Sequence, residues 1–202
     1  MYLTCLDLEG VLTPEMWILT AEQAGIPELR VTTREEPDYD KLMRYRIRIM
    51  KEHGLKIQDM QQAIAKADPL PGARKFLDEL RTFSQVIIVS DCFEQLARPL
   101  IAKLGYPTIF CHELVADGEG TITDYRMRIR KDTKLTTVKA FQQLGFDTVA
   151  SGDSYNDLDM IRASKAGFLF RTTGQIKKDN PDIPALETYD ELLSAIRSAE
   201  KQ

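Results

Sequence analysis

The sequence predicts a three-layer α/β fold in which helices cover both faces of a parallel sheet. Short apolar runs alternate with helical patterns, and such alternation gives parallel strands joined by right-handed crossovers. The runs are nearly continuous in apolar residues, as strands buried on both faces are. The predicted strands are 2–8, 85–90, 108–111, 147–152 and 166–170.

Three helical patterns lie beside these runs, at 72–83, 93–105 and 133–145. The last begins at Thr133, which we predict as its N-cap, and closes on Gly145. Each pattern leads into or out of a strand, so we expect these helices to pack on the sheet.

One segment breaks the alternation. Residues 14–68 hold helical patterns and no convincing strand, and "PLPG" at 69–72 marks the return to the sheet. We therefore expect a helical cap over 14–71 and a core formed by 1–13 and 72–202. Within the core, the alternating flanks of "DGEG" predict a β-hairpin over 112–129.

Composition excludes several classes of protein. The chain has 202 residues, 43% apolar and 29% charged, as an ordinary globular protein does. Its net charge of -4 gives no footprint for nucleic acid or an anionic membrane. The first apolar run is too short and acidic for a signal peptide, and no stretch is long enough to span a bilayer. Cys5, Cys92 and Cys111 lack metal-ligand spacing. We expect a cytoplasmic protein; a homodimer is left open.

Acidic and hydroxyl side chains follow three of the predicted strands. In open α/β sheets the carboxyl ends of the strands form the ligand-binding edge. We therefore expect these residues to lie together, and crowded carboxylates need a cation among them. Oxygen ligands without nearby His or Cys favour Mg²⁺. The residues are Asp7, Glu9, Ser90, Asp91, Asp153 and Asp157.

Two further observations bear on this edge. Lys134 begins the helix before the fourth strand, where a fixed cation can meet a phosphate oxygen or neutralise the acids. A calcium loop is the rival interpretation of "DSYNDLDM", but this stretch lacks the central Gly and the terminal Glu of such a loop.

These motifs resemble those of the haloacid dehalogenase superfamily of phosphotransferases. "DLEGVL" resembles its first motif, "IIVSD" its second, Lys134 its third and "GDSYND" its fourth, in matching order and spacing. The resemblance implies a Rossmann-like core. It also implies that Asp7 is the nucleophile that forms an aspartyl-phosphate.

The resemblance implies roles for the other motif residues. Mg²⁺ would be held by Asp7, the Glu9 carbonyl and Asp153, with Asp157 in support. Ser90 and Lys134 would bind the phosphoryl oxygens, and the second acid of the first motif would act as general acid and base. The family has Asp where this chain has Glu9, whose side chain is one methylene longer.

The predicted cap carries a cation on its apolar side. On a helical wheel of "KLMRYRIRIMK" (41–51), Arg46 falls within the apolar arc. An inward guanidinium needs an anion, from either a protein carboxylate or a substrate. The chain resembles the phosphoserine phosphatase branch, in which a Glu and a cap Arg bind the substrate ammonium and carboxylate. Glu15 and Arg46 match these positions.

The resemblance therefore implies a phosphoserine phosphatase, and most closely the bacterial type that also transfers the phosphoryl group to homoserine. The alternatives are a phosphatase for another small ester, such as a nucleotide or sugar phosphate, and an inactive binding scaffold. Asp91 and Asn156 adjoin motif residues and are candidates for substrate contact. We assign Trp17 to the core of the cap, and His112 to no site.

Overall fold

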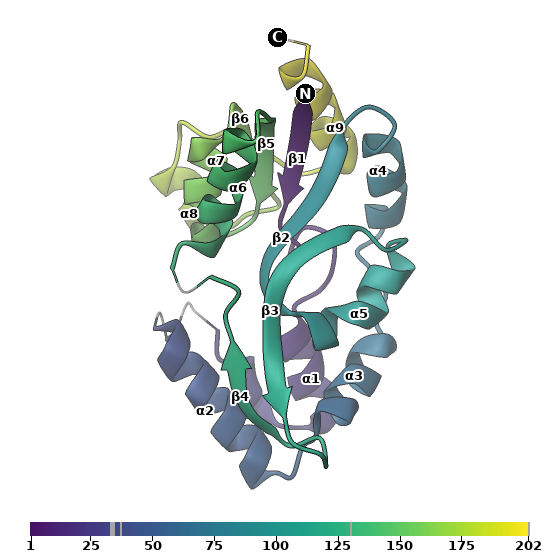
Figure 1. The fold of residues 1–202 in the computed structure, drawn as a ribbon, viewed down its shortest axis with the longest axis vertical. Helices are drawn as coiled ribbons and strands as arrows, with labels where there is room; N and C mark the ends of the chain where they lie inside the picture. The colour runs from purple at the N-terminus through teal and green to yellow at the C-terminus, as the bar shows by residue number, and fades with distance from the viewer. Residues whose placement is uncertain (33–34, 37, 130, 202) are drawn as a thin grey trace.

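The computed structural model describes residues 1–32, 35–36, 38–129 and 131–201. Within this part of the chain, seven strands form one sheet in the order β4-β3-β2-β1-β5-β6-β7 (Figure 1). All neighbouring pairs are parallel except β3 and β4. The predicted α/β class is confirmed. The strands are β1 (Tyr2–Leu6), β2 (Gln85–Phe93), β3 (Thr108–Ala116), β4 (Ile122–Arg126), β5 (Asp147–Gly152), β6 (Ala166–Phe170) and β7 (Ala185–Leu186).

Helices cover both faces of the sheet, and each face has its own apolar core. Alternate side chains of β1 point to opposite faces: Leu6 joins one core, while Leu3 and Cys5 join the other. The first core also holds side chains of α4 (Ala73–Leu80), α5 (Glu94–Lys103) and α9 (Tyr189–Ala199). The second core holds side chains of α6 (Thr133–Gln143), α7 (Leu158–Ala163) and α8 (Gly174–Asp179).

The segment between β1 and β2 is helical up to α4, as the sequence predicts. It contains α1 (Met16–Ala24), the 3₁₀ turn η1 (Pro27–Arg30), α2 (Tyr39–Glu52) and α3 (Ile57–Ala65). In Figure 1 the helices α1, α2 and α3 lie at the opposite end of the molecule from α9. The limits at 13/14 and 71/72 stay a prediction.

The predicted hairpin is formed by β3 and β4, and it reaches the helical segment. β3 pairs with β2 near its start and with β4 near its end, so one long strand serves both the sheet and the hairpin. β4 lies beside α2 in Figure 1, and the hydroxyl of Tyr125 donates to Oδ1 of Asp40 at 2.7 Å.

The predicted N-cap of α6 is wrong. Asp132 holds this position, with φ 49°, and Thr133 is the first helical residue. The Thr133 hydroxyl donates to the carbonyl of Ile129 at 3.1 Å. In the described ranges, no helix has both the length and the apolar character required to cross a bilayer.

Candidate active site

The carboxyl ends of β1, β2 and β5 meet at one edge of the sheet. β1 pairs in parallel with both neighbours, and the Asp7 N–H extends the ladder by donating to the Ser151 carbonyl at 3.0 Å. A cavity of about 350 Å³ opens there. It is lined by every predicted site residue except Asp157: Asp7, Glu9, Glu15, Arg46, Ser90, Asp91, Lys134, Asp153 and Asn156.

A tight turn at Gly10 lets the first motif approach the fourth. Gly10 has φ +77°, and its N–H donates to the Thr13 carbonyl at 2.9 Å. A Cβ atom at this position would lie 2.4 Å from Oδ2 of Asp153. Glycine is therefore required both for the left-handed backbone and for the contact with Asp153.

A buried ammonium group joins two of the carboxylates. Nζ of Lys134 lies 3.0 Å from Oδ1 of Asp7 and 2.5 Å from Oδ1 of Asp157. Burial, together with repulsion from Asp157 and Asp153, raises the pKa of Asp7 well above its ordinary value, although Lys134 opposes the shift. Burial lowers the pKa of Lys134, but attraction to Asp157 and Asp7 outweighs it and leaves that pKa well above its ordinary value.

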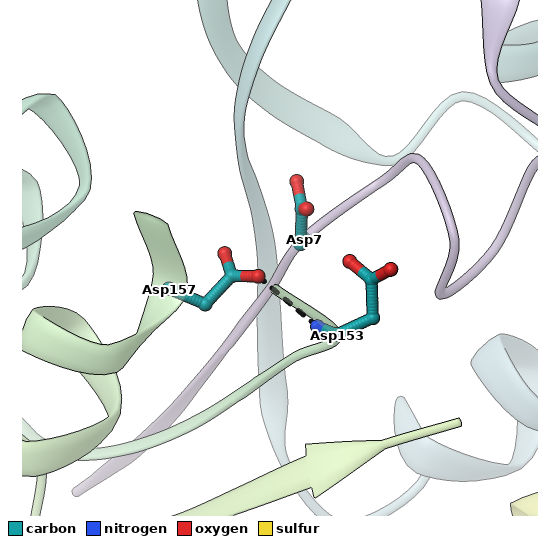
Figure 2. A group of neighbouring side chains, drawn as sticks. All are labelled: Asp7, Asp153 and Asp157. Carbon is teal, nitrogen blue, oxygen red and sulfur yellow. Dashed lines mark hydrogen bonds between the residues drawn. The ribbon is translucent and has the colours of Figure 1, made fainter. Parts of the chain in front are cut away.

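Asp157 braces the loop that carries Asp153. Its Oδ2 accepts the N–H groups of Asp153 and Ser154, each at 3.0 Å, and Figure 2 shows the first of these bonds. Its Oδ1 is taken by Lys134. A Cβ atom at Gly152 would lie 2.1 Å from the Asp157 carboxyl carbon, so the absence of a side chain at this position leaves room for the Asp157 carboxylate.

The acidic cluster fits a metal ion. Oxygen atoms of Asp7, Asp153 and Asp157 lie within 4.8 Å of one another (Figure 2). One ammonium group cannot neutralise three carboxylates, and an all-oxygen donor set suits a hard divalent cation. Both Asp157 oxygens accept hydrogen bonds from the protein, from Lys134 and from the N–H groups of Asp153 and Ser154.

Glu9 connects the sheet to the first helix. Its Oε1 accepts the N–H of Met16 at 2.6 Å, at the start of α1. This contact satisfies a helix N-terminal N–H for which Glu15, the N-cap residue, supplies no side-chain bond. Burial, followed by repulsion from Glu15, raises the pKa of Glu9 to about 7.

Arg46 is buried on the cavity wall, as the helical wheel predicts. Its Nη2 donates to the Val31 carbonyl at 2.8 Å, and its guanidinium lies 4.4 Å from the centroid of the Trp17 ring. Its Nε is buried and has no hydrogen-bond partner in the described structure. Burial lowers the pKa of Arg46 to about 10. Among the described residues, no carboxylate lies within ion-pair distance of this guanidinium.

Trp17, Tyr39 and His112 contact predicted site residues, although the sequence assigned them no role there. Trp17 is buried, as we expected, but it also lines the cavity, and its ring packs against the Arg46 guanidinium. The hydroxyl of Tyr39, at the start of α2, donates to the Asp91 carbonyl at 3.0 Å. His112 lies 3.4 Å from Oδ1 of Asp91. These contacts join residues far apart in sequence, and no local pattern marks them.

Comparison with known proteins agrees with the motifs. Residues 12–162 match the sequence model of the haloacid dehalogenase-like hydrolases. A phosphoserine phosphatase of Pseudomonas syringae pv. tomato is 47% identical over 94% of this chain and 80% of its own length. Phosphoserine phosphatase ThrH of Pseudomonas aeruginosa is 47% identical over 95% of this chain and 93% of its own length.

Solved structures share the fold. A substrate-bound phosphoserine phosphatase superposes with a TM-score of 0.78 at 23% identity, covering 95% of this chain and 96% of its own. A phospho-aspartyl intermediate analogue of phosphoserine phosphatase gives 0.76 at 24% identity, over 92% and 93% of the two chains.

Proposed function

This chain belongs to the haloacid dehalogenase-like hydrolases, and from that premise we propose that it is a Mg²⁺-dependent phosphoserine phosphatase that also transfers the phosphoryl group to homoserine. The observation that carries the choice of substrate is Arg46. A buried guanidinium that lines a cavity, with an unpartnered Nε and no carboxylate within ion-pair distance in the described structure, favours an anion from the ligand, and Glu9 and Glu15 are the protein charges that act on it.

Glu15 lines the same cavity and offers the opposite charge. An acid and a base beside a phosphate-binding edge suit a zwitterionic amino-acid phosphate, whose carboxylate would meet Arg46 and whose ammonium would meet Glu15. The names of the relatives that are 47% identical support phosphoserine. Homoserine is the acceptor that we propose beside water, on the resemblance of the sequence to the bacterial type that transfers the phosphoryl group to it.

Asp7 is the proposed nucleophile. Leu8 N–H and Lys134 Nζ both contact its Oδ1, at 2.7 and 3.0 Å, which leaves Oδ2 for attack. The bond from Oδ2 to phosphorus forms as the bond from phosphorus to the seryl oxygen breaks. Lys134 and the Ser90 hydroxyl bind the phosphoryl oxygens, because this transfer depends on positioning and charge neutralisation.

Glu9 supplies and then recovers the proton. Its carboxylic acid protonates the seryl oxygen as serine leaves, and the resulting carboxylate takes a proton from the acceptor hydroxyl. The acceptor oxygen then attacks phosphorus and frees Asp7. The bond to Met16 N–H occupies one Glu9 oxygen and leaves the other for proton transfer.

Mg²⁺, held by the carboxylates of Asp7 and Asp153 and the carbonyl of Glu9, would neutralise negative charge on the phosphoryl group. Asp157 supports this site because its hydrogen bonds fix the positions of the Asp153 backbone and of Lys134.

The rival function is hydrolysis of another small phosphate ester, and Arg46 separates the two. We would compare L-phosphoserine with O-phosphoethanolamine, which keeps the phosphate and ammonium but lacks the carboxylate. The Arg46→Ala change should raise KM for phosphoserine about 30-fold, the effect of one lost charged hydrogen-bond pair, and leave phosphoethanolamine unchanged.

Arg48→Ala is the matched control, because Arg48 lies on the same helix but is exposed and pairs with Glu52. The Arg48→Ala change should alter KM for neither substrate. Equal losses on both substrates in Arg46→Ala, or none on phosphoserine, would contradict the assignment of an amino-acid phosphate.

A further inference from the structure

Asp91 connects three separate elements at the cavity. Its Oδ2 accepts from Nδ2 of Asn156 at 2.8 Å, in the loop that follows β5. Its carbonyl accepts from the Tyr39 hydroxyl at 3.0 Å, at the start of α2. Its Oδ1 faces Nε2 of His112 on β3, at 3.4 Å. Asp91 and Asn156 both line the cavity, whereas His112 does not.

His112 is fixed in one tautomer. Its Nδ1 accepts the backbone N–H of Arg128 at 3.2 Å, so the proton of the neutral ring lies on Nε2 and points towards Asp91. The side chain is fully buried, and Nε2 makes no hydrogen bond in the described structure, although it lies 3.4 Å from Oδ1 of Asp91.

A bulge in β2 creates this contact. Val89 pairs with Phe110 and Phe93 pairs with His112, so three residues of β2 lie opposite one residue of β3. The extra residues turn the chain after Ser90 and bring Asp91 over His112. The rings of Phe93 and Tyr39 pack edge-on against the imidazole and hold its plane.

We propose that His112 is a positioning residue for the reaction. Its Nε2–H faces Oδ1 of Asp91 at 3.4 Å and attracts that oxygen, so that Oδ2 stays in place to accept from the Asn156 amide at the cavity wall. His112 thus acts on the substrate through two residues that touch the cavity, without touching the substrate itself. The kinetic part of this proposal rests on phosphoserine turnover as proposed above.

Two substitutions separate this role from simple packing. The Oδ1 atom of Asn takes the place of Nδ1, so His112→Asn keeps an acceptor for Arg128 N–H and loses the donor to Asp91. The amide of Gln takes the place of Nε2, so His112→Gln keeps the donor and loses the acceptor. We expect KM for phosphoserine to rise about tenfold in His112→Asn with a smaller change in kcat. We expect at most about a twofold change in His112→Gln.

Crystal structures of the two variants give a readout that does not depend on the substrate. The Asp91 Oδ2–Asn156 Nδ2 hydrogen bond should be broken in His112→Asn and kept in His112→Gln. The reverse order, equal effects in both variants, or an intact bond in His112→Asn would overturn the proposal. If the parent enzyme does not turn over phosphoserine, the proposed function fails, and the two structures still decide the role of His112.

Discussion

Nζ of Lys134 lies 3.0 Å from Oδ1 of Asp7, and both side chains are at most 7% exposed. The same ammonium group contacts Asp157, so one buried cation serves two carboxylates from segments that follow β1 and β5. Water screens these charges little, so removing any one of them changes the electrostatic balance of the whole edge. Substitutions of these charged residues should therefore change the free energy of unfolding as well as the activity.

Replacing Lys134 should destabilise the metal-free protein. Lys134→Met leaves the carboxylates of Asp7 and Asp157 buried without a cation, at a cost of about 3 kcal/mol at pH 7. The cost should shrink towards pH 5, because a carboxyl whose pKa is raised takes up a proton and loses its charge. Urea unfolding at both pH values measures it. Lys139→Met, an exposed change on the same helix, is the control; an equally small effect in both variants would contradict the prediction.

Asp7→Asn should abolish turnover while stabilising the metal-free fold at higher pH. Because the folded-state pKa of Asp7 is raised, its contribution to stability is present at low pH and is lost as pH rises above its ordinary pKa. Asn has no such loss. Turnover should fall by about 10⁴-fold or more. Tm is measured for variant and parent in the presence of a chelator, and the Tm of the variant minus that of the parent should be larger at pH 8 than at pH 5. A turnover rate like that of the parent, or the opposite trend in Tm, would count against this prediction.

Two Glu9 variants should separate its structural contact from its proton transfer. Glu9→Gln keeps an oxygen for Met16 N–H, so urea stability should stay within about 0.5 kcal/mol, while turnover falls about 10²–10⁴-fold. Glu9→Asp keeps the acid but is too short for the same contact, and it should lose about 1 kcal/mol of stability. Parallel losses of stability and activity in both variants would refute this division.

The stability of the fold at low pH should depend on the ionisation of Asp91. Burial alone would raise its pKa, but His112, Lys134 and Asn156 together lower it to about 2. A depressed carboxyl pKa stabilises the fold above the ordinary value, and this stability is lost as pH falls from about 4 to 2. The free energy of unfolding of the parent should exceed that of the Asp91→Asn variant by about 2 kcal/mol at pH 6 and by roughly half as much at pH 3. A pH-independent gap in urea unfolding would be inconsistent with the lowered pKa.

The sequence predicted the parts of this protein that depend on local pattern. Apolar runs located the buried strands, because strands covered on both faces need nearly continuous apolar residues. The wheel of α2 placed Arg46 inward, and it is 6% exposed. Residues at strand ends were expected at one edge, and the cavity there is lined by Asp7, Ser90 and Asp153.

Features that depend on tertiary contact were not predictable in this way. The bulge after Val89 appears only once β2 pairs with β3, so the contact between Asp91 and His112 has no sequence signal. The capping of α1 by Glu9, seven residues from Met16, also needs the turn at Gly10. The N-cap of α6 was misplaced because the Thr133 hydroxyl bonds backwards to Ile129.

The most direct test of the proposed function is product analysis with L-phosphoserine and Mg²⁺, with and without L-homoserine. We expect phosphate release without homoserine, and phosphohomoserine in its presence at the expense of phosphate. Phosphate alone in both reactions would contradict transfer to homoserine. No turnover of phosphoserine in either reaction would contradict the proposed function itself.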